Sequence, residues 1–217
     1  IHVLATPKAF SVVALGDSIT DGHASTTNGN DRWTDALARR LQSAPKTRNV
    51  GVLNQGIGGN HLLTDGLGPN VLARFDRDVL AQAGVRYVIV FEAINDLGGL
   101  ARVRNATDEQ HAALVHRIVG AYEQVIARTH AEHLKIIGAT ILPDGGSDYY
   151  HPRAADEADR QKVNQWIRAA GHFDAVVDLD KIMADPQDPT RMRPAYDSGD
   201  HLHPSPVGYK VIGESFP

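Results

Sequence analysis

A serine near the N-terminus has the surroundings of an enzymatic nucleophile. Ser18 follows Gly16 and Asp17 at the end of an apolar run, where a glycine permits a tight turn. A serine hydroxyl is a useful nucleophile only when a base lies within hydrogen-bond reach. If a helical turn begins at this serine, its free backbone N–H groups also point toward a bound acyl oxygen. The alternative is that Asp17 or Ser18 only caps a helix.

Acids and histidines in segment 198–204 are candidate partners for that serine. Asp200 precedes His203 by three residues, so its carboxylate can fold back to accept the Nδ1–H and leave Nε2 as a base. His201 and Asp197 are possible substitutes for this pair. Two alternatives stay open: a turn with solvent-exposed histidines, and a metal site built from Asp200, His201 and His203.

Acyl transfer also needs hydrogen-bond donors for the negative charge that develops on the carbonyl oxygen. Candidate donors are the backbone N–H groups of Ser18 and Gly59 and the side-chain amide of Asn95. A plain turn around Gly59 and a helix cap at Asn95 are the alternatives. Segment 56–59 reads Gly-Ile-Gly-Gly and lacks the Gly-x-Gly-x-x-Gly spacing, so it does not predict a dinucleotide site.

Short β-branched runs alternate with longer amphipathic stretches, which is typical of an α/β domain with a mainly parallel sheet. The expected strands cover residues 11–15, 50–54, 85–91, 134–142 and 174–179. The expected helices cover residues 30–42, 69–82, 107–131 and 153–170, with a last helix that Ser205 caps and Pro206 begins. Thr107 and Gln110 form a capping-box pattern. Polar clusters follow the first three strands, and ligands bind beyond the carboxyl ends of such strands. We therefore expect these clusters to converge on one site.

The composition limits the classes of function. The chain has 217 residues, of which 42% are hydrophobic and 22% charged, as expected for a single domain over residues 1–217. A formal net charge of −4 gives no electrostatic reason to expect a nucleic-acid partner. The lack of cysteine excludes disulfides, thiolate metal sites and a cysteine nucleophile. No apolar run is long enough to span a bilayer.

The N-terminus bears on the location of the protein. The chain begins at Ile1 without a methionine, so we expect a mature form or a piece of a longer protein. A secreted or periplasmic bacterial enzyme is favoured over a cytoplasmic one. The sequence does not predict an oligomeric state.

With these residues in view, the sequence resembles the SGNH hydrolase superfamily, also called the GDSL esterases and lipases. The resemblance rests on four blocks, Gly16-Asp17-Ser18-Ile19-Thr20-Asp21-Gly22, Asn54-Gln55-Gly56-Ile57-Gly58-Gly59, Ala93-Ile94-Asn95-Asp96 and Asp200-His201-Leu202-His203-Pro204. It implies a triad of Ser18, His203 and Asp200. It also implies Ser18, Gly59 and Asn95 as oxyanion donors. The implied fold is a flavodoxin-like three-layer α/β/α sandwich with a five-stranded sheet, and the implied reaction is ester hydrolysis without a metal or other cofactor.

The third block departs from the family pattern at Ala93, where the family has glycine. If the backbone there has positive φ, alanine costs about 1 kcal/mol and could shift Asn95; at negative φ the change is nearly harmless. Segments 32–41 and 199–204 look most like a bacterial branch found among polysaccharide-degrading enzymes. That resemblance implies a carbohydrate ester as substrate.

The expected substrate is a small-molecule or carbohydrate ester with a short acyl group, such as an acetyl or aryl ester, because no long apolar segment suggests a lipid tunnel. Candidate substrate contacts are Asp17, Asn60, His61 and Tyr196. The polar and aromatic loop 144–151 could line the site or be only a surface connection. Two rival functions remain. One is a metal-dependent hydrolase that uses the loop of Asp200, His201 and His203, and the other is a non-catalytic carbohydrate-binding relative.

Overall fold

Five short apolar segments form the central sheet in the computed structural model, which describes residue 6 and residues 8–217. The strands are β1 (Phe10–Gly16), β2 (Val50–Gly56), β3 (Val85–Phe91), β4 (Lys135–Ala139) and β5 (Ala175–Val177). They lie in the order β2-β1-β3-β4-β5, and every neighbouring pair is parallel. This is the flavodoxin-like order, so the predicted fold class is confirmed.

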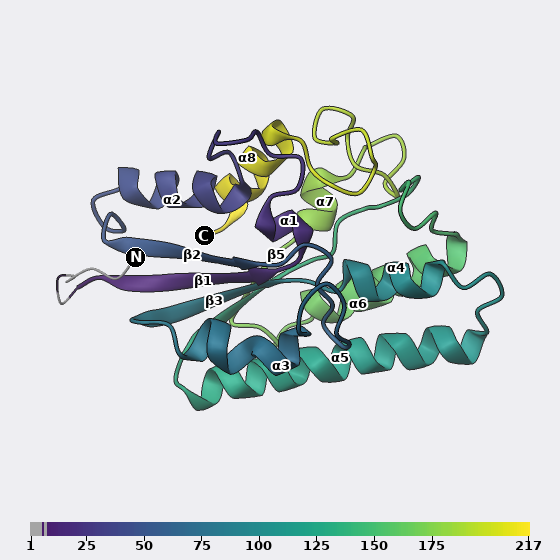
Figure 1. The fold of residues 1–217 in the computed structure, drawn as a ribbon, viewed down its shortest axis with the longest axis horizontal. Coiled ribbons are helices and arrows are strands. Elements are labelled where there is room, and N and C mark those ends of the chain that lie inside the picture. The colour runs from purple at the N-terminus through teal and green to yellow at the C-terminus, as the bar shows by residue number, and fades with distance from the viewer. Residues whose placement is uncertain (1–5, 7) are drawn as a thin grey trace.

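Helices cover both faces of the sheet (Figure 1). On one face lie α1 (Ser18–Asp21), α2 (Trp33–Ser43), α7 (Leu179–Met183) and α8 (Pro206–Ser215). On the other lie α3 (Val71–Phe75), the π-helical turn η1 (Asp76–Leu80), α4 (Ile94–Ala101), α5 (Asp108–Ala131) and α6 (Ala154–Arg168). The second half of β3, at the centre of the sheet, is buried from Val88 to Phe91, as expected for a parallel strand covered on both faces. Among the described residues, no helix has both the length and the hydropathy to cross a membrane.

The predicted helix signals at two positions are confirmed. Thr107 caps α5, and its hydroxyl and the Gln110 side chain form the expected capping box. Ser205 caps α8, with Pro206 in the first turn.

Several predicted boundaries differ from the structure for local reasons. The first predicted helix begins at Trp33 and not at residue 30, because Asn30 has φ +50° and Arg32 serves as the N-cap. The fourth strand ends at Ala139, before the predicted boundary. Its continuation leaves the sheet because the backbone of Ile141 bonds to side chains of α6: its N–H donates to Asn164 Oδ1 at 2.7 Å. The short helices α1, α4 and α7 were not predicted as helices.

Two glycines at strand ends allow α1 to sit directly on the sheet. A Cβ atom at Gly56 would lie 2.1 Å from the backbone N of Asp21, and one at Gly16 would lie 2.1 Å from Thr20 Oγ1. Asn54 adds a hydrogen bond from its side-chain amide to the backbone O of Thr20, at 2.7 Å. The position of Ser18 at the start of α1 therefore depends on the lack of side chains at these glycines.

We predict that Gly56→Ala forces α1 away from the end of β2, because the new methyl group meets backbone that cannot turn aside. The expected loss in the free energy of unfolding is about 1–3 kcal/mol, measured by chemical denaturation. Gly51→Ala on the same strand is the matched control, since the nearest atom to its Cβ is Ser11 Oγ at 3.8 Å. Equal stability of the two variants would contradict this account of the packing.

Candidate active site

The first residue of α1 is Ser18, which lies where β1 ends. Asp17 is the N-cap, and its Oδ1 accepts a hydrogen bond from the Ile19 N–H at 2.8 Å. The capping role considered for this segment is thus held by Asp17. Because Ser18 is the first residue of the helix, its backbone N–H has no intrahelical acceptor and no hydrogen-bond partner among the described residues. The Ser18 side chain is nearly buried but borders a cavity.

A continuous chain of hydrogen bonds links Ser18 to the C-terminal loop. Ser18 Oγ lies 2.9 Å from His203 Nε2, and His203 Nδ1 lies 2.6 Å from Asp200 Oδ2. Asp200 Oδ1 accepts the backbone N–H groups of Leu202 at 3.0 Å and His203 at 2.8 Å. These bonds fold the loop back, so that the carboxylate faces the ring three residues later. The structure therefore brings together the three side chains predicted for the triad.

The surroundings of this pair set its protonation. Burial of the His203 ring lowers its pKa below 6.5, although the Asp200 carboxylate acts in the opposite direction. Burial alone would raise the pKa of Asp200, but the backbone and ring hydrogen bonds from His203 outweigh it and lower that pKa to about 2. At neutral pH the site therefore holds a neutral imidazole beside a carboxylate, which is the state that a general base needs.

The substitute pair Asp197 and His201 lies apart from Ser18. The Nδ1 atom of His201 is 2.6 Å from Asp197 Oδ2, and Asp197 Oδ1 accepts the Gly199 N–H at 2.8 Å. These contacts shape the loop, and His201 does not line the cavity that contains Ser18. The metal set considered as an alternative, Asp200, His201 and His203, is also not assembled among the described residues. Among the described residues, the group within ligand distance is His23, Asp200 and His203.

The predicted oxyanion donors face the same cavity as Ser18. Gly59 has φ +69°, and its N–H has no hydrogen-bond partner among the described residues. The Asn95 amide donates to the backbone O of Asn60 at 2.6 Å, which leaves its second hydrogen free. Tyr150 O–H donates to Asn95 Oδ1 at 2.5 Å, and this bond fixes which end of the amide carries the donors. Tyr150 belongs to loop 144–151, which the sequence left as either site lining or surface connection.

The cavity has a volume of about 530 Å³, a size typical of small-molecule sites. It is lined by Ser18, His23, Gly58, Gly59, His61, Gly66, Leu67, Asn95, Gly99, Arg102, Tyr149, Tyr150, Leu202 and His203. His23, missed by the sequence reasoning, lies against His203 with ring centroids 4.0 Å apart and the ring planes tilted by 37°. Tyr149 meets His203 edge-on, with centroids 5.5 Å apart.

Of the four predicted substrate contacts, only His61 lines this cavity. The Asp17 side chain is buried at the helix cap. Asn60 is also buried, because its Oδ1 accepts from Arg74 Nε at 2.9 Å and its Nδ2 donates to Pro69 O at 2.8 Å. Tyr196 packs under the Arg193 guanidinium, 5.7 Å from it. The structure thus places these three side chains outside the lining of the cavity that contains Ser18.

Three buried carboxyl groups lie beneath the site. Burial raises the pKa of Asp17 to about 7. Burial, and then the nearby carboxyl groups of Asp17 and Asp96, hold the pKa of Glu92 well above its usual value. Burial also raises the pKa of Asp96, against the N–H groups of Leu62 and Leu63 that bond to its oxygens. Burial therefore raises the pKa of all three of these carboxyl groups.

Ala93 has φ +85°, in the left-handed region, and is fully buried. It is the N-cap of α4, and its N–H donates to Glu92 Oε2 at 2.9 Å. The left-handed conformation costs an alanine about 1–2 kcal/mol. Asn95 nevertheless lies at the cavity with its amide oriented by Tyr150 and Asn60. The substitution for glycine thus strains the backbone without displacing the asparagine.

We predict that Ala93→Gly changes the free energy of unfolding by less than about 1 kcal/mol. Relief of strain is offset by the loss of a buried methyl group, about 0.8 kcal/mol, and by the greater freedom of glycine in the unfolded chain. Because Asn95 is already in place, hydrolysis of a short ester should change by less than about threefold. Denaturant melts and steady-state kinetics test both statements. A tenfold gain in activity would mean that alanine does displace Asn95.

Comparison with known proteins fits this arrangement. Residues 14–211, which include the four sequence blocks, match the GDSL-like Lipase/Acylhydrolase family. No curated protein matches the chain. Among solved structures, the acetyl xylan esterase AlAXEase is 21% identical, with TM-score 0.71 and coverage of 95% of this chain and 97% of that one.

Two further solved structures are similar at the level of the fold. A GDSL-like lipase from Bacteroides thetaiotaomicron is 21% identical, with TM-score 0.68 and coverage of 99% of this chain and 89% of that one. A variant of Axe2, an acetyl xylan esterase from Geobacillus stearothermophilus, is 20% identical, with TM-score 0.66 and coverage of 96% and 94%. Since the family match extends over most of the sequence, the chain belongs to the GDSL-like lipase/acylhydrolase family of ester hydrolases.

Proposed function

We propose that this protein is a serine esterase in which Ser18 is the nucleophile, His203 the general base and Asp200 the residue that orients the histidine. The observation that carries the proposal is the unbroken hydrogen-bond chain from Ser18 Oγ through the imidazole to the carboxylate, with spacings of 2.9 and 2.6 Å. These are the distances at which a hydroxyl proton passes to a base.

In the proposed reaction, His203 Nε2 takes the hydroxyl proton as Ser18 Oγ attacks the ester carbonyl. Asp200 stabilises the imidazolium that forms. The imidazolium then protonates the oxygen of the leaving alcohol, and an acyl group remains on the serine. Water repeats the sequence, with the histidine again as base, and releases the carboxylic acid and the free enzyme.

The negative charge on the carbonyl oxygen is held by donors that already face the cavity. These are the unpaired N–H groups of Ser18 and Gly59 and the free amide hydrogen of Asn95. Loss of one such donor typically lowers kcat by about 100- to 1,000-fold. Tyr150 orients the Asn95 amide, because its O–H donates to Asn95 Oδ1.

We propose short acyl esters of carbohydrates as the substrates, acetyl esters first. Two solved structures that share this fold are described as acetyl xylan esterases. In keeping with such a substrate, the cavity combines aromatic side chains, Tyr149 and Tyr150, with polar groups such as His23 and Arg102. A polymeric carbohydrate substrate fits the expectation that the enzyme is secreted or periplasmic.

The test of the mechanism is hydrolysis of p-nitrophenyl esters, from acetate upward, with a chelator present. We expect turnover that is best on the shortest esters, and Ser18→Ala should lower kcat by several orders of magnitude, about 10⁶ in a comparable triad enzyme. Ser43→Ala on α2 is the matched control. Activity of Ser18→Ala near the wild-type level would remove Ser18 from the mechanism. Activity that the chelator abolishes and zinc restores would favour the metal-dependent rival, and sugar binding without turnover would favour the non-catalytic one.

We also predict the pH dependence of kcat/KM. The base must be neutral, and burial lowers the pKa of His203 below 6.5. Activity should therefore be lost in acid and rise to a plateau through an apparent pKa below 6.5. The neighbouring His23 side chain contributes to that lowering of the His203 pKa, so His23→Gln should move the rise toward higher pH. A rise centred above pH 7 in the wild type would contradict the assignment of the base.

A further inference from the structure

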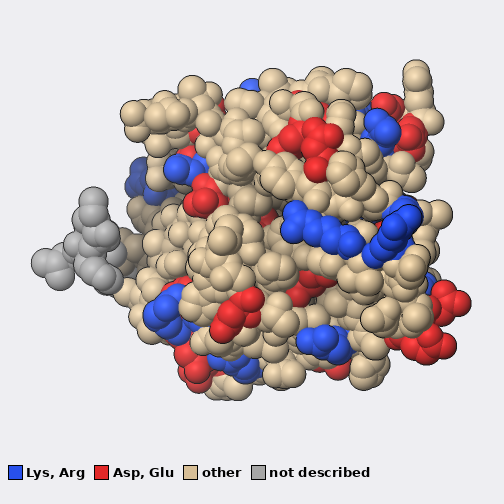
Figure 2. All heavy atoms as spheres, turned by 45° about the vertical axis from the view of Figure 1, so that its right-hand side comes forward, with Lys and Arg blue, Asp and Glu red and all other residues tan. Residues whose placement is uncertain are grey.

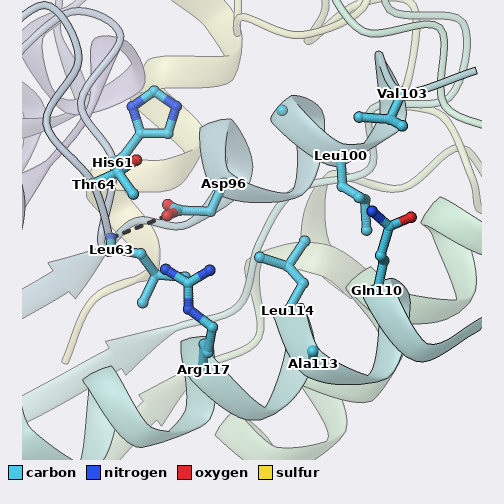
Figure 3. Close-up of a pocket in the computed structure, with 11 residues that line it drawn as sticks. His61, Leu63, Thr64, Asp96, Leu100, Val103, Gln110, Ala113, Leu114 and Arg117 are labelled. Carbon is cyan, nitrogen blue, oxygen red and sulfur yellow. Dashed lines mark hydrogen bonds between the residues drawn. The ribbon is translucent and has the colours of Figure 1, made fainter. Parts of the chain in front are cut away.

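A second cavity of about 400 Å³ lies beside the first, between α4, α5 and the segment 61–64 (Figure 3). Its wall includes Leu100 of α4 and Leu114 and Arg117 of α5. The two cavities share His61 and Gly99 as lining residues. A molecule bound at Ser18 can therefore extend over Gly99 into the second cavity.

Packing within the protein does not explain the glycine at position 99. A Cβ atom built there meets nothing within 4 Å, and Gly99 does not have positive φ. Its neighbour Gly98 differs, since a Cβ there would lie 2.4 Å from the Tyr150 ring. Glycine inside a helix is less favourable than alanine. A bare backbone at Gly99 keeps the passage between the two cavities open, which points to a ligand that crosses it.

Gly120 of α5 is the one other helical glycine in the described chain with nothing within 4 Å of its Cβ. It lines neither cavity. Lack of crowding alone is therefore not a sign of a ligand, and the inference at Gly99 rests on its place between the cavities. Gly120 supplies a matched control.

Arg117 is the one Lys or Arg side chain among the residues that line the second cavity. Arg117 points toward Leu63 in Figure 3 and forms no ion pair or hydrogen bond with another described residue. Arg128 on the same helix, in contrast, is paired with Asp76 at 2.6 Å. Asp96 also borders the cavity, but its oxygens accept the N–H groups of Leu62 and Leu63. The wall thus presents an uncompensated cation to a bound molecule.

A second cation without a carboxylate partner lies at the first cavity. Arg102 donates from Nε to the backbone O of Tyr149 at 3.1 Å, and its guanidinium lies 4.8 Å above the Tyr150 ring. Figure 2 shows some of the blue side chains (Lys or Arg) next to one another on the face that it draws, with red side chains (Asp or Glu) elsewhere on that face. In a chain with a formal net charge of −4, unpaired arginines at both cavities favour an anionic ligand.

We propose that the two cavities form one extended groove for an esterified oligosaccharide that carries carboxylate groups, as uronic acid units do. The acylated sugar lies at Ser18, the chain crosses Gly99, and Arg117 binds the carboxylate of a neighbouring unit. This proposal rests on the proposed function for the position of the ester. Binding in the groove itself does not require turnover.

Binding is measured first, by calorimetry with the Ser18→Ala protein and an unesterified oligogalacturonide, against a neutral xylo-oligosaccharide of equal length. We expect the acidic oligosaccharide to bind more tightly than the neutral one. High salt should weaken binding of the acidic oligosaccharide, because it screens charges. When Arg117→Gln is combined with Ser18→Ala, Kd for the acidic ligand should rise about tenfold, which is the effect of losing one charge-assisted hydrogen bond. Arg48→Gln, the same charge change at an exposed position outside both cavities, should leave Kd unchanged.

Kinetics then test the passage over Gly99. In Gly99→Leu, the ratio of kcat/KM on an acetylated oligogalacturonide to that on p-nitrophenyl acetate should fall about tenfold or more. Gly120→Ala should keep the wild-type ratio. Gly99→Leu must also retain a cooperative melt, which separates a blocked groove from misfolding.

The outcomes separate this proposal from the proposed function. Wild-type turnover of p-nitrophenyl acetate that is lost in Ser18→Ala supports the esterase mechanism alone. If Arg117→Gln does not weaken acidic binding, or both oligosaccharides bind equally, the carboxylate site is overturned while the esterase stands. If no ester is hydrolysed but the acidic ligand binds through Arg117, the groove stands and the catalytic proposal fails. If Gly99→Leu leaves the ratio of kcat/KM on the acetylated oligogalacturonide to that on p-nitrophenyl acetate unchanged, the proposal that the ligand crosses Gly99 is overturned.

Discussion

The geometry of the site depends on one buried cation, the guanidinium of Arg74. Its Nη2 donates to the backbone O of Gly16 at 3.0 Å, its Nη1 to that of Gln55 at 2.7 Å, and its Nε to Asn60 Oδ1 at 2.9 Å. One side chain thus joins the end of β1, which leads to the nucleophile, to the end of β2, which leads to the glycine block. An ion pair with Asp78 at 3.2 Å compensates part of its charge. Removing one partner of such a buried pair costs about 3–5 kcal/mol, so this junction contributes strongly to stability.

The same cation reaches the third oxyanion group through an intermediate residue. Asn60, held by Arg74, accepts the Asn95 amide with its backbone O at 2.6 Å. Arg74 also acts on the buried acids below the site, because it lowers the pKa of Asp17 and Glu92 against the larger effect of burial. Since burial dominates, these groups keep their pKa values raised. Raised pKa values lower the cost of burying several acidic groups close together, so these groups can pack beneath the nucleophile.

Sequence reasoning was most successful where the signal is local. The strand over residues 85–91 was predicted with the bounds that β3 has, and the cap at Thr107 follows from two side chains on one turn. Ser18, Gly59 and Asn95 also line one cavity, because they follow neighbouring strands of a parallel sheet whose carboxyl ends share one edge. Arg74 was missed, since its acceptors come from strand ends far away in sequence. The inward direction of Asn60 was missed for the same reason: its side-chain partners are set by tertiary packing.

The α4 helix shows why parts of the active site cannot be predicted from the helix propensities of the local sequence. It begins at Ala93 in a left-handed conformation and contains the uncrowded Gly99, so its own sequence weakens it at two positions. Its position is set from outside, by Asp96, which accepts two backbone N–H groups of the adjacent loop, and by the Tyr150 bond to Asn95. A helix held by its neighbours can carry a strained start and a bare backbone, because neither has to be stable alone. Of these two positions, Gly99 lines both cavities, while Ala93 is buried and lies two residues before Asn95. At the first an open passage, and at the second a fixed amide, matters more than helix propensity.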